Sequence, residues 1–141
     1  MNAVIREMAA ADYSGMMALW RSCEGVGLTS DDSPEGIGAL LERNPGLSFV
    51  AELNGEIIGT SVCSHDGRRG LIYHLAVAEA HRRRGLGREL ALRSVAALGR
   101  CGIRKCHIWV YANNLAGQGF WEEIGWEKRH DLLMMSKTIS K

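Results

Sequence analysis

Residues 73–90 read as a strand, a turn and a basic, glycine-bearing helix start, and this order constrains the fold more than any other feature of the sequence. The strand, 73–77, is followed by a loop in which Gly85 and Gly87 stand among four arginines. Glycine has no Cβ, so the backbone there can approach an anion closely. A helix start also offers unpaired N–H groups and the positive end of the helix dipole. The sequence therefore predicts a polyphosphate-binding loop at a strand-to-helix junction.

Two common phosphate motifs do not fit this loop. The dinucleotide fingerprint lacks its third glycine, and the P-loop lacks its Gly-Lys-Ser/Thr ending. The pattern Arg/Gln-x-x-Gly-x-Gly/Ala does fit, at Arg82, Gly85 and Gly87, directly after the strand residues 75–77. With these residues the sequence resembles the GNAT N-acetyltransferase superfamily, whose acetyl-CoA pyrophosphate loop has this form.

The overall composition predicts one globular domain, residues 1–141, with a core of ordinary size. The chain has 141 residues, of which 46% are hydrophobic and 23% charged, and its formal net charge is +1. Such a balance argues against nucleic acid or a membrane surface as a partner. The three contiguous arginines 82–84 form a local cluster, which suits a small anionic ligand.

The sequence also indicates a cytoplasmic protein. The N-terminal residues lack the basic start and apolar run of a signal peptide, and no apolar stretch is long enough to span a membrane. The four cysteines form no CxxC pair, so we expect reduced, mostly buried thiols. We expect no metal site, because Cys106 and His107 are adjacent on a strand and point to opposite faces.

Hydrophobic periodicity and capping residues give the expected element order. Asn54-Gly55 between two apolar runs is a strong hairpin signal. The expected strands are 4–8, 47–53, 56–63, 71–77, 106–111 and a closing pair at 126–129 and 132–140. The expected helices are one capped by Asp12 with Met16, Leu19 and Trp20 on its apolar face, one at 33–43, one at 84–98 burying Leu86, Leu90, Val95 and Leu98, and one at 113–123.

This order matches the GNAT order, so the resemblance extends over nearly the whole chain. Asn113-Asn114 followed by the segment 120–126 (FWEEIGW) is similar to the family's "N…FY…GF" helix. The resemblance implies an α/β (α+β) fold with a mixed, mostly antiparallel sheet of six to seven strands flanked by helices. It also implies that the parallel strands 71–77 and 106–111 splay apart, and that the pantetheine arm of acetyl-CoA pairs with the first of them.

The resemblance implies a set of acetyl-CoA contacts along the chain. The backbone of the strand end would hold the pantetheine arm, and the loop amides would hold the pyrophosphate. These residues are Leu75, Ala76, Val77, Arg82, Arg83, Arg84, Gly85, Leu86, Gly87, Arg88, Asn114 and Trp121. Trp121 stands where the family often has a tyrosine acid, and an indole cannot give up a proton at neutral pH. It therefore either packs at the pantetheine end or is a core aromatic beside Phe120.

A proton acceptor must come from elsewhere, because Trp109 stands where some members place a glutamate base. Tyr73 and His74 lie on the splayed strand near the expected acetyl group, and strand alternation would send only one of them into the site. Glu24 lies in the loop between the first two helices, where it would attract a cationic amine. Asp31 and Asp32 are further carboxylates in this loop, although Asp32 also reads as a cap of the second helix.

We therefore predict an acetyl-CoA-dependent N-acetyltransferase that acts by direct transfer to a primary amine, with His74, Tyr73 and Glu24 as catalytic candidates. A small cationic acceptor is favoured by the carboxylates. Two alternatives stay open: a catalytically silent acyl-CoA-binding sensor or partner module, and an acetyltransferase of protein N-termini or lysines. Homodimers are common in the family, and the sequence specifies no mode of dimerisation.

Overall fold

The computed structural model describes residues 2–140. They fall into two compact units, Met1–Trp109 and Val110–Lys141, and each is described by itself. The first unit holds the whole sheet and three of the four α-helices, and the second holds the fourth.

Five strands form one mixed sheet in the order β1-β2-β3-β4-β5. The strands are β1 (Val4–Glu7), β2 (Phe49–Leu53), β3 (Glu56–His65), β4 (Gly70–Val77) and β5 (Cys106–Ile108). Neighbours pair antiparallel except β4 and β5, which are parallel and pair only from Gly70↔Cys106 to Ile72↔Ile108. The predicted class of fold is confirmed, with five strands among the described residues rather than six to seven.

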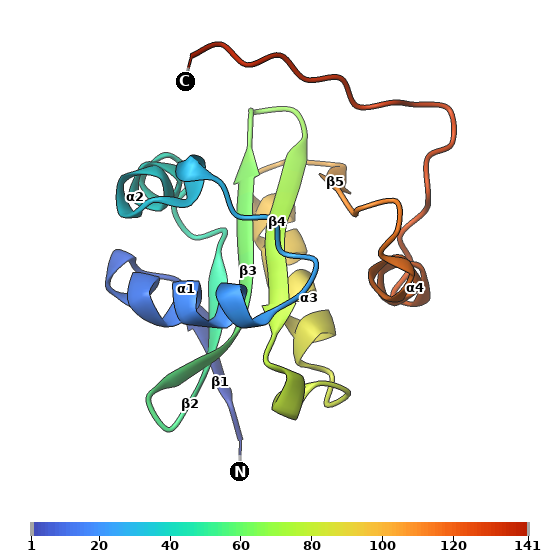
Figure 1. Ribbon diagram of the computed structural model, residues 1–141. Helices are drawn as coiled ribbons and strands as arrows, with labels where there is room; N and C mark the ends of the chain where they lie inside the picture. Colours follow the sequence, from blue (N-terminus) through green and yellow to red (C-terminus); the bar gives the residue numbers. More distant parts are fainter. Residues whose placement is uncertain (1, 141) are drawn as a thin grey trace. The chain divides into compact units, whose positions relative to one another are not determined.

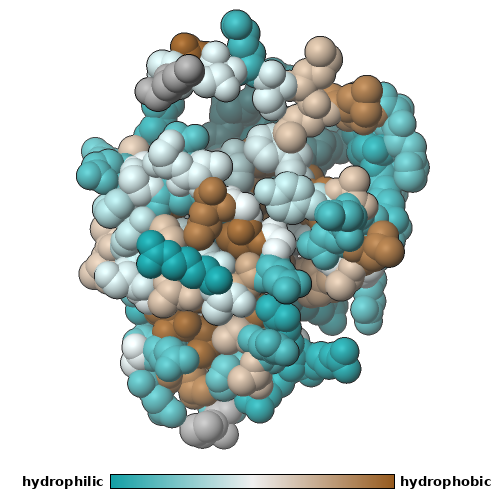
Figure 2. All heavy atoms as spheres, viewed as in Figure 1, coloured by the Kyte–Doolittle hydropathy of each residue, from teal (hydrophilic) through white to brown (hydrophobic). Residues whose placement is uncertain are grey.

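Helices cover both faces of this sheet (Figure 1). The helices α1 (Tyr13–Ser22) and α2 (Pro34–Arg43) pack on one face, and α3 (Leu86–Arg100) packs on the other. The core under α1 contains Met16, Trp20, Ile37 and Val62, so the predicted apolar face of α1 is the buried one. On the face drawn in Figure 2, hydrophobic side chains form small groups separated by hydrophilic ones.

The ends of α1 and α2 are capped differently from the sequence prediction. Asp12 occupies the N-cap position of α1, but its carboxylate accepts from the N–H of Ala9 and pairs with Arg6 at 2.8 Å instead of capping the helix. The cap of α2 is the Ser33 hydroxyl, which accepts from the N–H of Gly36 at 3.0 Å. Of the two readings of Asp32, the cap is therefore not the one observed, and its carboxylate contacts His74 instead.

The packing of α3 against the sheet depends on a glycine in β3. A Cβ at Gly59 would lie 2.8 Å from Cδ1 of Leu90, a leucine that is fully buried. The buried stripe of α3 also includes Ser94, whose hydroxyl donates to the carbonyl of Leu47 and contacts that of Ser61. Val95, predicted to be buried, is exposed instead, because the stripe passes through the polar Ser94.

The β2–β3 hairpin forms as the sequence predicted. Asn54 and Gly55 have φ of +51° and +80°, the conformation that a two-residue Asn-Gly turn requires. The turn joins two strands whose residues are largely buried at their centres, including Val50, Ala51 and Ile58. The meander β2–β3–β4 thus delivers the chain to the arginine-rich loop.

The second unit contains α4 (Leu115–Glu123), which begins just after the predicted capping pair Asn113-Asn114 and ends at the predicted residue. The Asn114 side chain caps it by accepting from the N–H of Gly117 at 2.9 Å. Trp121 packs edge-on against Phe120 and Trp126. Residues 126–140 form no strand, so the predicted closing pair is wrong: the segment 127–140 is exposed and forms no strand ladder.

The four cysteines are free thiols, as predicted, but they are less uniformly buried than expected. Cys23 and Cys63 are buried, Cys106 is half-buried and Cys101 is exposed at the end of α3. Within residues 2–140, no helix is long and apolar enough to cross a membrane. The same residues contain no group of three or more His, Cys, Asp or Glu side chains placed to hold a metal ion.

Candidate active site

A β-bulge interrupts β4 at His74. Val62 faces Tyr73 and Thr60 faces Ala76, so the single residue between them on β3, Ser61, stands opposite both His74 and Leu75. His74 has a φ of +44°, which is uncommon for a residue with a side chain. A bulge of this kind re-aims the side chains at its position and bends the strand.

The bulge turns two consecutive side chains to the same face of the sheet. The His74 ring lies 4.7 Å from the Trp20 ring on α1. The Tyr73 ring packs against the same core and lies 6.4 Å from the His74 ring. The expectation that alternation would send only one of the two to this face is therefore wrong. Alternation assumes regular strand dihedrals, and the positive φ of His74 breaks them.

Three contacts hold His74 in place. The Thr60 hydroxyl donates to the carbonyl of His74 at 2.7 Å and accepts from the indole N–H of Trp20 at 2.9 Å. The Trp20 ring packs against the imidazole. The third contact joins Nε2 of His74 to Oδ1 of Asp32 at 2.8 Å.

Asp32 is itself fixed by the loop between α1 and α2. It ends a short 3-10 helix, η2 (Ser30–Asp32), and its second carboxylate oxygen accepts from the N–H of Thr29 at 3.0 Å. The Tyr13 hydroxyl donates to the Asp32 carbonyl at 2.6 Å. The His74 and Asp32 side chains are only 13% and 12% exposed, so this pair is well shielded from water.

An aromatic pair stands where β4 and β5 separate. Tyr73 and Trp109 directly follow the last paired residues of the two strands, and their rings meet edge-on at 5.6 Å. Trp109 is 58% exposed, which leaves much of its ring open to a ligand. Burial raises the pKa of Tyr73 above its ordinary value, so its phenol stays protonated near neutral pH and is a donor rather than a base.

The loop after β4 has the backbone geometry of an anion site. The loop begins with the 3-10 turn η3 (Glu79–His81). Arg83 and Gly85 then have φ of +66° and +81°, and α3 begins at Leu86. The first bond of α3 runs from the N–H of Glu89 to the carbonyl of Gly85 at 3.0 Å. The amides of residues 86–88 come before that bond and have no partner within the helix.

The loop arginines divide into two kinds. Arg82 turns back onto the protein: its Nε donates to the carbonyl of Val77 at 2.9 Å, and its Nη2 lies 3.7 Å from the Cys23 sulfur. Arg83, Arg84 and Arg88 are exposed, and no salt bridge in the described chain includes them. Arg82 therefore ties the loop to the end of β4, and the other three present their charge to solvent.

The remaining candidates are not joined to this group. Glu24 is exposed in the α1–α2 loop and makes no hydrogen bond or ion pair with another described residue. Asn114 and Trp121 belong to the second unit and are described only within it. The turn residue Asp66 accepts from the N–H groups of Arg68 and Arg69, so it serves the β3–β4 turn.

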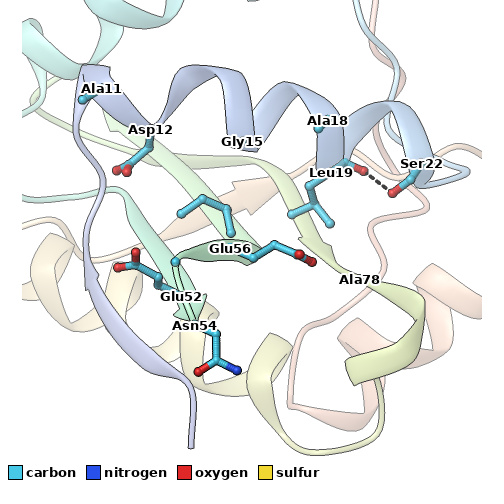
Figure 3. Close-up of a pocket in the computed structure, with 12 residues that line it drawn as sticks. Ala11, Asp12, Gly15, Ala18, Leu19, Ser22, Glu52, Asn54, Glu56 and Ala78 are labelled. Atoms are coloured by element: carbon cyan, nitrogen blue, oxygen red, sulfur yellow. Dashed lines mark hydrogen bonds between the residues drawn. The ribbon is translucent and has the colours of Figure 1, made fainter.

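A separate hollow of about 670 Å³ lies between α1 and the β2–β3 hairpin. Its lining includes the carboxylates of Asp12, Glu52 and Glu56, which come from both elements (Figure 3). The first two already bind the guanidinium of Arg6, at 2.8 and 3.0 Å. The single positive charge of Arg6 thus offsets one of the three negative charges of this hollow.

Sequence reasoning missed how Trp20, Thr60 and Asp32 surround His74. The helical spacing identified Trp20 as a core residue, but no local pattern links position 20 or 32 with position 74. The positive φ of His74 also leaves no trace in the sequence, because the bulge arises from the pairing of β3 with β4.

Comparisons with known proteins identify the family of this chain. The model of the acetyltransferase (GNAT) family matches residues 13–126. An acetyltransferase of Pectobacterium atrosepticum is 33% identical over 123 residues, covering 87% of this chain and 86% of that protein. One from Yersinia pestis is 32% identical over 135 residues, covering 96% and 94%.

Solved structures share the fold at lower identity. The PaiA N-acetyltransferase of Thermoplasma acidophilum, in complex with coenzyme A, superimposes with a TM-score of 0.79 at 17% identity, covering 90% of this chain and 91% of that one. The aminoglycoside acetyltransferase AAC(6')-Iy, with a bisubstrate analogue, gives 0.78 at 19% identity, covering 98% and 99%. Fold, sequence relatives and family model agree, and this chain belongs to the acetyltransferase (GNAT) family.

Proposed function

We propose that this acetyltransferase moves an acetyl group from acetyl-CoA directly to the primary amine of a small cationic molecule. The observation that carries the proposal is the free edge of β4. Beyond Ile72 the strand continues to Val77 with no β5 partner among the described residues, and it leads straight into the glycine-bearing loop. Free strand edges pair with extended amide chains, and the pantetheine arm of acetyl-CoA is such a chain.

The loop supports the same assignment for the other end of the cofactor. A pyrophosphate would accept hydrogen bonds from the unpaired amides at the start of α3, where the positive φ of Gly85 opens the turn. Arg83, Arg84 and Arg88 would neutralise its charge, while Arg82 keeps the loop on Val77. The coenzyme A complex of the PaiA neighbour supports this use of the fold.

The acceptor would lie on the α1–α2 face, beside Tyr73 and His74. The open face of Trp109 and the carboxylate of Asp32 are both suited to a positively charged amine. Aminoglycosides are polyamines of this type, and two of the structural neighbours are aminoglycoside acetyltransferases. Glu24, exposed on the same loop, remains a proposed contributor to this attraction.

The reaction needs a base and a donor. His74 would take a proton from the ammonium, after which the amine nitrogen bonds to the acetyl carbon and the carbon–sulfur bond breaks. Two protons leave the nitrogen overall: one passes through His74 to water, and the other ends on the CoA thiolate. A backbone N–H at the bulge would polarise the thioester carbonyl, and the Tyr73 hydroxyl would donate a hydrogen bond in the site.

Release of free thiol from acetyl-CoA tests the proposal. The purified chain is incubated with acetyl-CoA and a panel of polyamines, aminoglycosides, amino acids and lysine-containing peptides, and the thiol is measured together with the acetylated product. We expect turnover with at least one small polyamine. Binding of acetyl-CoA without turnover on any amine would support the silent-module alternative, and turnover only on peptides would support a protein acceptor.

A further inference from the structure

We infer that Asp32 is a positioning residue that fixes the tautomer of His74, so that Nδ1, and not Nε2, accepts the proton of the amine. This inference rests on the proposed function, because it concerns the same proton transfer. It names the atom that carries out the transfer and the residue that selects that atom.

The hydrogen-bond directions around Asp32 determine the tautomer. A carboxylate only accepts hydrogen bonds, and both of its oxygens are occupied here. Thr29 N–H donates to Oδ2 at 3.0 Å, and the imidazole Nε2 lies 2.8 Å from Oδ1. Nε2 must therefore carry the hydrogen of this bond. In the neutral ring the lone pair then lies on Nδ1.

Nδ1 is also the ring nitrogen that the described residues leave without a hydrogen-bond partner. None of the described residues forms a hydrogen bond with it, whereas the ring face is packed on Trp20 and the backbone carbonyl is held by Thr60. Because Nδ1 is the nitrogen nearer the backbone, it lies beside the bulge of β4. A half-turn of the ring would put the carbon Cε1 where Nε2 now lies and would break the bond to Asp32.

The same contacts predict what an amide at position 32 would do. In Asp32→Asn, the backbone N–H of Thr29 would hold the amide oxygen, which turns the amide NH2 towards Nε2. Nε2 must then accept, the hydrogen moves to Nδ1, and the proposed base is blocked. The substitution replaces one carboxylate oxygen by an NH2 group and reverses the tautomer, which removal of the side chain would not do.

The adjacent Asp31 offers a matched control. It lies in the same 3-10 helix and carries the same charge, but it is exposed and its carboxylate makes no hydrogen bond within the described chain. Asp31→Asn therefore changes the net charge by the same amount without touching His74. Any effect that both variants share is due to charge, and any effect of Asp32→Asn alone is due to the contact.

Two-bond proton–nitrogen NMR spectra of the imidazole rings provide the direct test. They are recorded on the nitrogen-labelled full chain, without ligands, at a pH where the ring is neutral, and His74 is identified by its loss in His74→Gln. We expect the hydrogen on Nε2 in the native chain and in Asp31→Asn, and on Nδ1 in Asp32→Asn. A hydrogen on Nδ1 in the native chain, or an unchanged tautomer in Asp32→Asn, would overturn the inference.

Kinetics supply the second readout once an acceptor is found. Asp32→Asn should lower kcat by about 100-fold or more, the usual contribution of a positioned base, with the KM for acetyl-CoA unchanged. A fall in acetyl-CoA affinity without a fall in kcat would contradict a positioning role. The NMR measurement needs neither substrate. A hydrogen on Nδ1 in the native chain would therefore refute this inference alone. The expected tautomer without any turnover would refute only the proposed function.

Discussion

Thr60 connects the core under α1 to the bulge that presents His74, and Thr60→Val tests this connection. Valine has nearly the same shape as threonine but lacks the hydroxyl. The substitution leaves the indole N–H of Trp20, a residue that is 1% exposed, without an acceptor, and it removes the donor to the His74 carbonyl. Packing volume is almost unchanged, so the effect reports on the hydrogen bonds.

The expected cost follows from these two bonds. A buried donor left without a partner costs about 1–3 kcal/mol, and loss of a typical hydrogen bond to the carbonyl costs about 1 kcal/mol. The methyl group that replaces the hydroxyl returns roughly 0.8 kcal/mol. The free energy of unfolding should therefore fall by about 1–3 kcal/mol, which for a chain of this length lowers Tm by about 3–10 °C.

Thermal and urea unfolding measure this change, with Thr60→Ser as the matched control. Serine keeps the hydroxyl and loses one methyl group, so it should cost about 1 kcal/mol. In a Trp20→Phe background, Thr60→Val should cost less, because the stranded N–H is already gone. An effect of Thr60→Val no larger than that of Thr60→Ser, or one equal in both backgrounds, would refute the reasoning.

Three further predictions concern the loop before α3, the ion pair of Arg6 with Asp12, and the cysteine thiols. Gly85→Val should abolish acetyl-CoA binding in calorimetry, while Gly102→Val, at nearly the same φ of +82° and the other end of α3, should leave it intact. A hydrogen-bonded guanidinium and a backbone N–H hold the pKa of Asp12 below its ordinary value. The stability that Asp12→Asn removes should therefore be greatest at neutral pH and should disappear as pH falls below about 4, measured as unfolding free energy against pH. Burial raises the pKa of Cys63 to about 12, so mass spectrometry after brief alkylation at pH 8 should show label on the exposed Cys101 and none on Cys63.

Each of these has an outcome that would contradict it. Equal loss of binding in both glycine variants would mean that backbone strain, and not the anion site, is responsible. A constant difference between native chain and Asp12→Asn from pH 7 to pH 3 would show that the ion pair adds nothing in the folded state. Rapid labelling of Cys63 would show that this part of the sheet opens readily.

Much of the first unit was predictable because local signals agreed with one another. The Asn54-Gly55 turn, the helix expected at 33–43 and the apolar stripe of α1 each depend on neighbours within a few residues. The glycine-rich loop carried the family resemblance in the same way. Where structure is set by residues close in sequence, the sequence is sufficient.

The sequence-based predictions failed where the structure depends on contacts between residues far apart in the sequence. The hydrogen bond of His74 joins positions 32 and 74, and the bulge depends on the register of two strands. Ser94 reads as a polar surface residue, but carbonyl and hydroxyl partners 47 and 33 positions away allow its burial. The apolar residues after 131 resemble a strand by composition, yet strands form only against a partner edge, which composition does not specify.

Gly59 lies in the core, yet it affects the position of the loop that we propose binds acetyl-CoA. Gly59 pairs with Val77 at the end of β4, and its missing side chain makes room for Leu90, one turn into α3. The lack of a side chain at Gly59 therefore determines how closely the start of α3, with its loop amides, packs on the sheet. A position outside the proposed acetyl-CoA site would thus act as a spacer for it, and its size would be a means of tuning acetyl-CoA affinity from inside the core.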